Sequence, residues 1–552
     1  MNPFLQKLAL ISPEIAMAIG AALCLFLGLA PSAAVRRTTV WVAAGTLTAA
    51  GVLVLRKVTS DFEFFSFDVI LSGLTLASYI KLAVVGVGLL LLMVAAQLPG
   101  QLPQIRAAEA APRFDPSLVF RGEFFAFFLL SLTGVMLTAG ADDLVWLFLA
   151  LELTSLPTYI MVATSRARPG AQEAAVKYFF LGALAVAVFL YGFTLIYGAT
   201  GFTDFAGIHR HVAIHGMSTL MLTGVVLALV GVAFKIAAFP MHFYVADVYQ
   251  GAATPVTAFL AFVPKTAGFV AIVLILRLVA DAAGQIPDPI MWLLWIMAVL
   301  TMTIGNTLGM MQTSVKRVLA YSSIAHSGYM LVGLIAGVGA TGQTLGSGLA
   351  AVLFYLVAYG LANLAAFAVL GCLRTNRAGT PSSPVSSGDE ADSFDDIAGL
   401  SRRHPGLAAI MLVALLSLIG LPPMVGFLGK IYIFGSVLAH SGDQPAFVWL
   451  VVIAVLNSAV SAVYYLKIAA ACYFGQPQPG AQGAPAEGIA AIRVPSRIAG
   501  ATLAALAAII LGVAGGPLVD AAYSAAGAAM RATYTDAQPA AQPDTTSTAL
   551  LP

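Results

Sequence analysis

Four charged side chains stand inside long apolar stretches of this sequence. Glu152 lies in WLFLALELTSLPTYIMV, Lys235 in VLALVGVAFKIAAFP, Lys265 in TAFLAFVPKTAGFVAIV and Lys430 in LSLIGLPPMVGFLGKIYIF. A charge at the centre of a membrane helix costs about 2.5–3.5 kcal/mol to insert, so it normally serves a function or meets a partner. Carboxylates and amines that are removed from bulk water can accept and release protons. The four residues are therefore candidate proton-transfer groups.

Each of these charges also has a structural explanation, which stays open at this point. A lysine stem is long enough to carry its amine to the membrane surface while its carbons remain in the apolar region. The Glu152 side chain is shorter, so its structural alternative is a fixed partner that only locks helix packing. Glu14 and Glu123 open their predicted helices, where a carboxylate suits the positive end of the helix dipole. Glu123 is in addition a candidate for a proton entrance, and Lys81 is interpreted as reaching the surface.

Prolines interrupt two of the charged stretches. Pro240 follows Lys235, and Pro422 and Pro423 precede Lys430. A proline leaves backbone groups without helical partners, and in lipid these groups must be met by other protein atoms or by water. Transporters place ion sites on such broken helices near the middle of the membrane. The sequence therefore predicts two broken helices beside an ion pathway.

The composition places these residues in a membrane. Of the 552 residues, 60% are hydrophobic and only 9% are charged, and the mean hydropathy is +0.93. Soluble domains carry roughly 25% charged residues, and apolar runs of about 20 residues can cross a bilayer as helices. The net charge of only +2 argues against a nucleic-acid partner. The predicted fold class is an all-α polytopic membrane protein embedded in the lipid bilayer.

Apolar runs and the breaks between them predict about fourteen transmembrane helices. Their limits are 10–30, 38–55, 74–97, 123–140, 143–163, 172–198, 217–240, 254–279, 289–312, 315–337, 345–373, 406–434, 446–474 and 496–518. Spans 4–8 and 9–13 are predicted to form two inverted five-helix repeats, because an odd offset of spans reverses orientation. The predicted divisions are 1–121 (helices 1–3), 122–279 (first repeat), 280–475 (second repeat, with a cytoplasmic loop at 374–405), 476–519 (helix 14) and 520–552 (disordered tail).

The loop charges predict an orientation. Arg and Lys residues gather in the odd-numbered loops and are scarce in the even-numbered loops. Basic loops remain on the cytoplasmic side, so both termini are expected on the non-cytoplasmic side. The Ser/Pro-rich and then acidic segment 374–404 is interpreted as a flexible cytoplasmic loop, and the tail after Arg531 as disordered.

Metal and iron–sulfur sites are not expected in this chain. Cys24, Cys372 and Cys472 lie far apart within apolar segments, which does not suit a clustered thiolate site. The histidines in the loop after span six are interpreted as solvated rather than metal-binding; they are His209, His211 and His215.

Several stretches resemble the antiporter-like membrane subunits of respiratory complex I (NADH:quinone oxidoreductase), and within them the subunit N family. The resemblance covers 122–163, 234–268, 304–331 and 419–434, and with the helix count it extends to about residue 518. FPMHFYVADVYQGA and LAYSSIAHSGYML are highly specific to this superfamily. Lys430, a tyrosine-bearing span eleven (FYLVAYGLANLAAF) and the lack of a long lateral C-terminal helix point to the subunit N family within it.

The resemblance implies that Glu152 and Lys235 form an ion pair, that Lys265 is the central lysine and that Lys430 is the exit-side lysine. Making or breaking a charge pair changes how strongly a buried amine holds its proton. The pair would thereby switch the proton affinity of Lys235, which could pass a proton through water to Lys265 and then to Lys430. Candidate hydrogen-bonding members of this path, each equally typical of a satisfied core residue, are His242, His326, Tyr355 and Tyr359.

The predicted function is a proton-translocating subunit of NADH:quinone oxidoreductase in the bacterial inner (plasma) membrane. The resemblance implies no cofactor in this chain, with NADH, flavin and iron–sulfur clusters in other subunits and quinone as the substrate of the complex. It implies membrane-arm subunits M and K as neighbours. One alternative is a subunit of a multisubunit cation/proton antiporter, and another is a structural subunit whose buried charges only lock helix packing.

Overall fold

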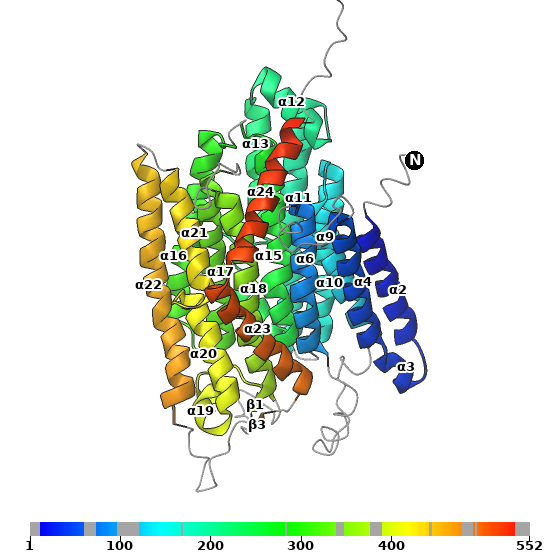
Figure 1. The fold of residues 1–552 in the computed structure, drawn as a ribbon, viewed down its shortest axis with the longest axis vertical. Coiled ribbons are helices and arrows are strands. Elements are labelled where there is room, and N and C mark those ends of the chain that lie inside the picture. Colours follow the sequence, from blue (N-terminus) through cyan, green and yellow to red (C-terminus); the bar gives the residue numbers. More distant parts are fainter. Residues whose placement is uncertain are drawn as a thin grey trace, which may run out of the picture.

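The computed structural model describes residues 11–59, 73–96, 121–166, 169–281, 284–337, 347–375, 389–440, 444–476, 490–491 and 494–535. Within these ranges the chain is nearly all helical, and its long helices run side by side between two ends of one bundle (Figure 1). The start of the first described helix and the end of the last lie at the same end of that bundle.

Among the described residues, the helices are accompanied by one small antiparallel sheet of three short strands, in the order β2-β1-β3. The helices are α2 (Ser12–Gly28), α3 (Ala33–Arg37), α4 (Thr39–Thr59), α6 (Leu76–Ala95), α9 (Arg121–Ala139), α10 (Leu144–Ser165), α11 (Pro169–Thr200), α12 (Phe205–His215), α13 (Thr219–Val232), α14 (Val245–Gly251), α15 (Thr254–Arg277), α16 (Asp288–Met310), α17 (Val315–Ile335), α18 (Gly348–Cys372), α19 (Leu400–Arg403), α20 (Pro405–Ile419), α21 (Val425–Ala439), α22 (Pro445–Phe474), α23 (Pro495–Val513) and α24 (Gly516–Thr535). The strands are β1 (Leu373–Thr375), β2 (Asp389–Glu390) and β3 (Ala490–Ala491), and a 3-10 turn, η1, covers Asp395–Ile397.

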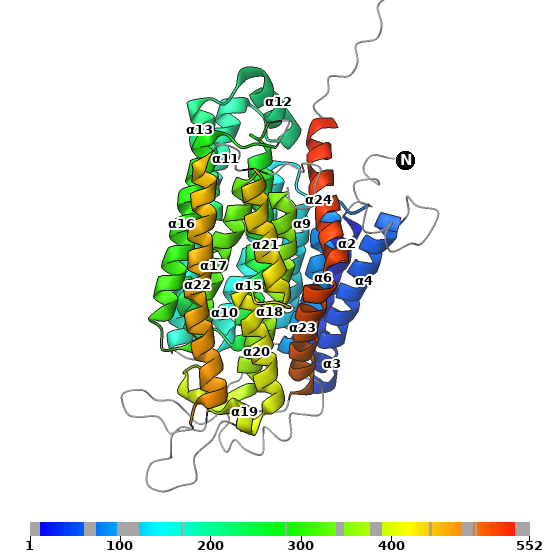
Figure 2. The same cartoon turned by 60° about the vertical axis from the view of Figure 1, so that its left-hand side comes forward.

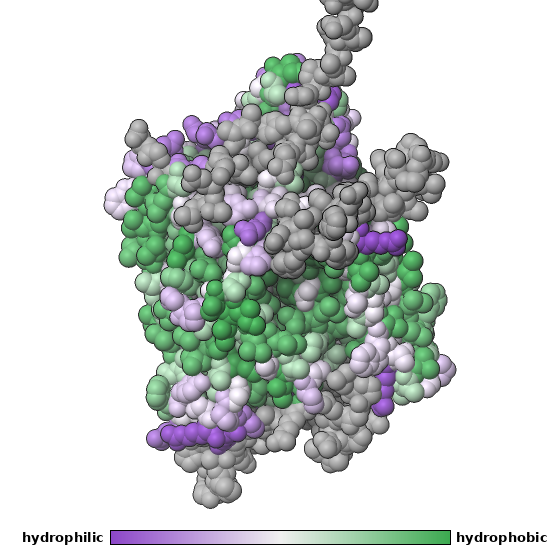
Figure 3. Space-filling view, viewed as in Figure 1, coloured by the Kyte–Doolittle hydropathy of each residue, from purple (hydrophilic) through white to green (hydrophobic). Residues whose placement is uncertain are grey.

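The predicted polytopic all-α fold is confirmed. Within the described ranges, 11 helices are long and apolar enough to cross a bilayer, and shorter apolar helices include α2, α13 and α21. Each predicted span coincides with one of these helices or, for spans seven and twelve, with a broken helix. Figure 3 shows the corresponding surface, apolar around the middle of the bundle and hydrophilic toward its ends. The chain is a multi-pass membrane protein.

Three central helices hold the core of the bundle. Within their most apolar windows α15 is 100% buried, and α17 and α18 are each 94% buried. A helix that is apolar on all sides is stable only when it is surrounded by other helices or lipid. The outer helix α22, in contrast, is 22% buried and borders the face of the bundle seen in Figure 2. The polar groups of α15, α17 and α18 are therefore shielded from lipid by protein.

Both predicted helix breaks are present. Helix α13 ends at Val232 and α14 begins at Val245, with Pro240 in the turns between them. Helix α20 ends at Ile419 and α21 begins at Val425, with Pro422 and Pro423 between them. Lys235 consequently lies in a break rather than at the middle of a continuous helix, while Lys430 lies one turn into α21.

Three sequence predictions about loops are wrong where the structure describes them. The predicted disordered tail is helical in part, because α24 continues to Thr535 and packs against α18 and α6; residues 536–552 lie outside the described residues. The acidic half of the predicted flexible loop is a docked segment at 389–404, and residues 376–388 lie outside the described ones. The three histidines lie on the helix α12 rather than in a loop, and His209 is buried, whereas His215 is exposed as predicted.

A buried arginine ties the C-terminal helices to the core. Arg497 on α23 donates hydrogen bonds to the backbone carbonyls of Val94 and Gly371, in the last turns of α6 and α18. Carbonyls at a helix C-terminus have no hydrogen-bond partner within the helix, so the guanidinium supplies one. Its positive charge also interacts favourably with the negative ends of both helix dipoles.

Candidate functional site

Lys235 forms an ion pair with Glu152 across the gap between the broken helix and α10. The Lys235 amine lies 3.3 Å from Glu152 Oε1 and also donates to the Ser155 hydroxyl and to the Leu151 carbonyl. Glu152 and Ser155 are one turn apart and so share a face of α10. The lysine side chain is 2% exposed and the glutamate 17%. This ion pair is buried on its lysine side and reaches the lateral surface on its carboxylate side.

Lys265 occupies the centre of the bundle on α15. Its amine donates to the Ser323 carbonyl and, at 2.8 Å, to the Ser327 hydroxyl, both on α17. The Ser327 hydroxyl in turn donates to the Ile236 carbonyl at 2.5 Å, next to Lys235 in the chain. Among the described residues no carboxylate lies within ion-pair distance of Lys265. The described hydrogen bonds of Lys265 therefore all go to hydroxyl and carbonyl oxygens.

A small cavity lies between Lys235 and Lys265. Its volume is about 10 Å³, and its walls include both lysines and the side chains of Tyr178, Tyr244 and Tyr249. A cavity of about 10–15 Å³ is the smallest that holds one water molecule. The two lysines therefore border a common space in which a single water could bridge their amines.

His326 on α17 connects the centre of the bundle to the second half. Its Nδ1 lies 2.7 Å from the Tyr355 hydroxyl on α18, and its Nε2 lies 2.9 Å from the Tyr465 hydroxyl on α22. Its ring centroid lies 5.1 Å from that of Tyr359, whose ring lies 5.0 Å from the Lys265 amine. Among the described residues the buried Tyr359 hydroxyl has no hydrogen-bond partner. A buried hydroxyl of this kind requires a polar neighbour such as water.

Lys430 lies at the end of a broken helix. Its amine donates to the carbonyls of Leu418 at 3.1 Å and Ile419 at 2.7 Å, the last residues of α20, and to the Ser458 hydroxyl at 2.8 Å. The free carbonyls at a helix C-terminus carry partial negative charge and favour a cation. The break at Pro422 and Pro423 therefore creates the site that holds the amine.

Two predicted site residues, Glu123 and His242, have no described contact with the series of buried polar groups that runs from Glu152 to Lys430. Glu123 is half-buried in the first turn of α9. His242 is buried in the break after α13, and its ring packs beside Phe239 and Phe243. The structure brings together Glu152, Lys235, Lys265, His326, Tyr355 and Tyr359, and the Tyr329 ring connects His326 to Lys430 at 5.5 Å from the imidazole and 5.1 Å from the amine. None of the described contacts of Glu123 and His242 is with these residues.

Sequence reasoning missed the hydroxyl groups of the site. The hydroxyls of Ser155, Ser327 and Tyr465 contact a proton-transfer candidate, and Ser323 does so through its backbone carbonyl. A signal existed for Ser155, since it lies one helical turn from Glu152. The others face their partners only after helices distant in the chain pack together.

A second buried ion pair was also missed. The Lys81 amine lies 2.6 Å from Glu14 Oε1, with side-chain exposures of 10% and 4%. The interpretation of Lys81 as a surface-reaching side chain is therefore wrong, because α2 supplies a partner inside the bundle. Pairing of this kind compensates the cost of burying each charge.

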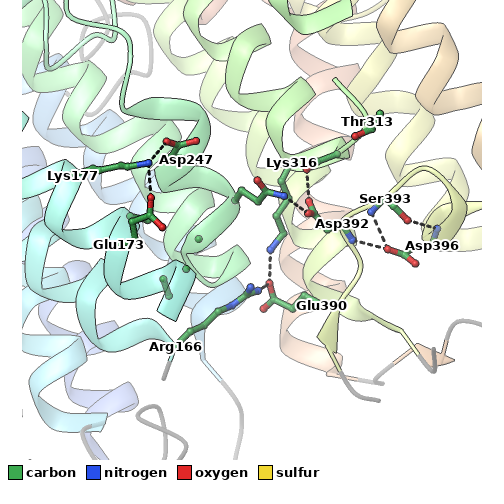
Figure 4. Close-up of a pocket in the computed structure, with 16 residues that line it drawn as sticks. Arg166, Glu173, Lys177, Asp247, Thr313, Lys316, Glu390, Asp392, Ser393 and Asp396 are labelled. Carbon is green, nitrogen blue, oxygen red and sulfur yellow. Dashed lines mark hydrogen bonds and ion pairs between the residues drawn. The ribbon is translucent and has the colours of Figure 1, made fainter. Parts of the chain in front are cut away.

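A larger cavity of about 660 Å³ opens at the end of the bundle that carries the small sheet (Figure 4). Charged residues of both signs line it, and Figure 4 shows them in pairs. Lys177 lies 2.8 Å from both Glu173 and Asp247. Arg166 and Lys316 converge on Glu390.

Comparison with known proteins gives one family and several relatives. Residues 141–460 match the family described as NADH:quinone oxidoreductase/Mrp antiporter, transmembrane. The chain is 44% identical over 357 residues to NADH-quinone oxidoreductase subunit N of Trichlorobacter lovleyi, covering 64% of this chain and 68% of that one. It is 37% identical over 441 residues to the subunit N of Mycobacterium tuberculosis, covering 78% and 77%.

Solved structures with the same fold include chains of respiratory complex I and of an Mrp complex. A chain of respiratory complex I from Thermus thermophilus with bound aureothin is 29% identical, with a TM-score of 0.68 and coverage of 92% of this chain and 98% of that chain. A chain of the Mrp complex from Dietzia sp. is 21% identical, with a TM-score of 0.72 and coverage of 95% and 99%. The second likeness concerns the fold alone.

Proposed function

The chain belongs to the NADH-quinone oxidoreductase subunit N family, and from that membership we propose that its series of buried amines carries protons across the membrane. It is a proton-translocating membrane subunit of an enzyme that oxidises NADH and reduces quinone. The NADH, flavin and iron–sulfur chemistry takes place in other subunits of the complex. This chain supplies the membrane path that uses the released energy.

The observation that carries the proposal is a row of buried polar groups that joins the two halves of the bundle. Glu152 and Lys235 stand at one side, Lys265 at the centre and Lys430 at the other side. Lys235 and Lys265 share a cavity, and Ser327 links Lys265 to the Ile236 carbonyl beside Lys235. The Tyr359 ring lies between Lys265 and His326, and the Tyr329 ring lies between His326 and Lys430. Water-bridged contacts between such groups are nearly as favourable as direct hydrogen bonds, so protons can pass along them.

The Glu152–Lys235 pair acts as the switch of this path. When the carboxylate is near, the charged amine is stabilised; when it withdraws, the amine gives its proton to the next group. Glu152 suits this role because its carboxylate reaches the lateral face of the bundle, where a neighbouring subunit can move it. Energy from quinone reduction would arrive at Glu152 and release the proton of Lys235 toward Lys265.

The second half of the path passes His326 and ends at Lys430. Tyr355 and Tyr465 hold both nitrogens of the imidazole, which can accept a proton at one nitrogen and release it from the other. Lys430, held by the carbonyls that end α20, receives the proton for release. Glu123 would serve at the entrance of the path, and His242 as a hydrogen-bonding member of it.

The setting of the subunit follows from its family and its charges. We place it in the bacterial inner membrane with both termini on the non-cytoplasmic side, as the basic odd-numbered loops indicate. Its neighbours in the multisubunit complex would be the membrane-arm subunits M and K. The two broken helices, α13 and α20–α21, support a division into two inverted repeats at 122–279 and 280–475.

A subunit of a cation/proton antiporter is the second candidate, since the Mrp chain shares this fold. Purification of the tagged chain from its native membrane separates the two. Co-purification with NADH:quinone activity supports the main proposal, and recovery with transport proteins alone contradicts it. The structural alternative is tested in the same complex by Lys265→Met, since loss of pumping with intact assembly excludes a purely structural lysine.

A further inference from the structure

One carboxylate, Glu390, gathers the ends of four helices at the sheet-bearing end of the bundle. It forms ion pairs with Arg166, which follows α10, with Lys316 in the first turn of α17, and with Arg374 in β1 directly after α18. The Lys316 amine lies 2.7 Å and the Arg374 guanidinium 3.5 Å from its oxygens. Its Oε2 also accepts hydrogen bonds from the backbone N–H, at 3.0 Å, and the hydroxyl of Thr254, the first residue of α15.

These four helices bear the middle of the proposed proton path, together with Glu152. Helix α10 carries Glu152, α15 carries Lys265, α17 carries His326, and α18 carries Tyr355 and Tyr359. The Glu390 side chain is only 9% exposed, so its contacts are shielded from solvent and strong. A shift of this carboxylate would change where the four helices begin or end relative to one another.

The residues around Glu390 fix it in place. We call residues 389–396 the acidic clasp. Asp392 accepts hydrogen bonds from the Ser314 hydroxyl at 2.5 Å and the Gln250 amide at 2.7 Å, and its carbonyl accepts the Val315 N–H at 2.6 Å. Asp396 closes the clasp on itself by accepting the N–H groups of Asp392 and Ser393. Figure 4 shows the clasp forming one side of the larger cavity.

We propose that Glu390 is a positioning residue for proton translocation, which holds α10, α15, α17 and α18 in register through the acidic clasp. This inference rests on the proposed function, because register matters only if the residues on these helices exchange protons. Transfer between positioned groups is sensitive to geometry, and a misplacement of about 1 Å can reduce a rate by a factor of about 100.

Glu390 is an anchor and not a proton carrier itself. Burial alone would raise the pKa of its carboxyl, but Lys316, Arg166 and Arg374 together hold that pKa well below the usual range. A carboxyl that stays ionised at neutral pH does not accept protons from the cytoplasm. Its charge is therefore permanently available to the three cations.

The test measures protons pumped and NADH oxidised per assembled complex in membrane vesicles. Glu390→Gln removes the charge, Glu390→Asp shortens the side chain while keeping the charge, and Glu390→Gln with Lys316→Gln removes both buried charges. Glu173→Gln is the matched control, because Glu173 lines the same cavity but is 66% exposed. Exposed ion pairs contribute little, so the control should pump like the wild type.

The clasp predicts that Glu390→Asp and the double variant assemble but pump about tenfold more slowly, since the four helix ends lose their common partner. Wild-type pumping in either of these two variants would overturn the proposal. In particular, if Glu390→Gln fails to assemble and adding Lys316→Gln restores both assembly and normal pumping, Glu390 only neutralises a buried lysine.

Pumping by Lys265→Met, measured in the same experiment, distinguishes failure of this inference from failure of the proposed proton-translocating function. Normal pumping by Lys265→Met would refute the proton path, whatever the Glu390 variants do. Loss of pumping by Lys265→Met together with normal pumping by the Glu390 variants would refute the clasp alone.

Discussion

Lys235 has a carboxylate 3.3 Å from its amine, whereas the described contacts of Lys265 and Lys430 are hydroxyl and carbonyl oxygens and one tyrosine ring each. This difference gives the lysines different roles. Movement of Glu152 can change the charge around Lys235 directly, because an opposite charge strongly stabilises a buried ammonium. Lys265 and Lys430 have fixed dipoles around them, so they respond to the proton arriving from their neighbour. Lys235 therefore acts as the switch together with Glu152, whereas Lys265 and Lys430 pass the proton on.

At the same scale, the Tyr465 hydroxyl is predicted to matter for proton transfer. It contacts His326 Nε2 at 2.9 Å and the Ser322 hydroxyl, so Tyr465→Phe removes the group that joins the imidazole to α22. We expect pumping per complex to fall roughly tenfold, below the range of about 10²–10⁴ for loss of a direct acid–base group. Tyr432→Phe is the control, since that half-buried ring packs on Phe354 outside the series. Equal pumping by both variants would remove Tyr465 from the path.

At the scale of elements, broken helices place the two outer lysines. The Lys235 amine is brought to α10 because α13 stops at Val232, and the Lys430 amine meets free carbonyls because α20 stops at Ile419. A continuous helix would have used these carbonyls in its own hydrogen bonds. Gly420 makes the second stop possible, as its φ of +85° lies in the left-handed region that glycine tolerates best.

Gly420→Ala is therefore predicted to impair Lys430. A β-carbon at this position would lie 2.9 Å from Lys430 Cδ, and the left-handed backbone would add strain of about 1–2 kcal/mol. We expect the lysine to be displaced from the α20 carbonyls and the pumping rate to fall, measured per assembled complex. Gly406→Ala on the same helix has open space around its β-carbon and is the control. If Gly420→Ala pumps as fast as Gly406→Ala, the placement of Lys430 by this break is wrong.

The spans and their breaks could be predicted because both depend on local sequence. Apolar runs mark the spans, and Pro240 and Pro422 mark the interruptions. The contacts of Lys265 with α17 and of Lys81 with Glu14 could not be predicted, because they depend on which helices pack together. The docked clasp was missed for the same reason, since its Ser/Pro-rich approach resembles a linker and Glu390 meets its cations only in the folded chain. Helix α24 was missed because alanine-rich, weakly polar residues are ambiguous without the helices they pack on.

At the scale of the whole molecule, distant segments hold one proton path together. Glu390 ties four helices at one end of the bundle, and Arg497 ties α23 to the ends of α6 and α18. The path itself crosses both proposed repeats from Glu152 to Lys430. Stability and function are therefore linked, because the ties that hold the bundle also set the distances along the path.

The ion pairs of Glu390 in the acidic clasp should give the stability of the complex a specific pH dependence. The pKa of Glu390 is held well below its usual range by its cations, so its contribution is complete above the unfolded value of about 4.3 and is lost only as pH falls through the lower folded value. Glu390→Gln should destabilise the complex by about 3–5 kcal/mol, as expected when one partner of a buried pair is removed. Glu390→Gln takes away the carboxylate that lies 2.7 Å from the buried Lys316 amine, so charging that lysine costs the variant more than the wild type. Lysine is charged in the unfolded chain at these pH values, so the difference in Tm between wild type and Glu390→Gln should widen as pH falls from about 8 to 5. A difference that shrinks between these values would show that Glu390 titrates in the neutral range.

The central claim is that the buried lysines carry protons driven by the redox reaction of the complex. The most direct measurement is NADH-driven proton pumping in membrane vesicles, with NADH:quinone activity and assembly recorded together, for Lys235→Ala, Lys265→Ala and the wild type. If the lysines carry protons, both variants assemble, and pumping and NADH:quinone activity fall together because the two processes are coupled. Variants that assemble and pump at the wild-type rate would contradict this claim, and the buried lysines would then be structural.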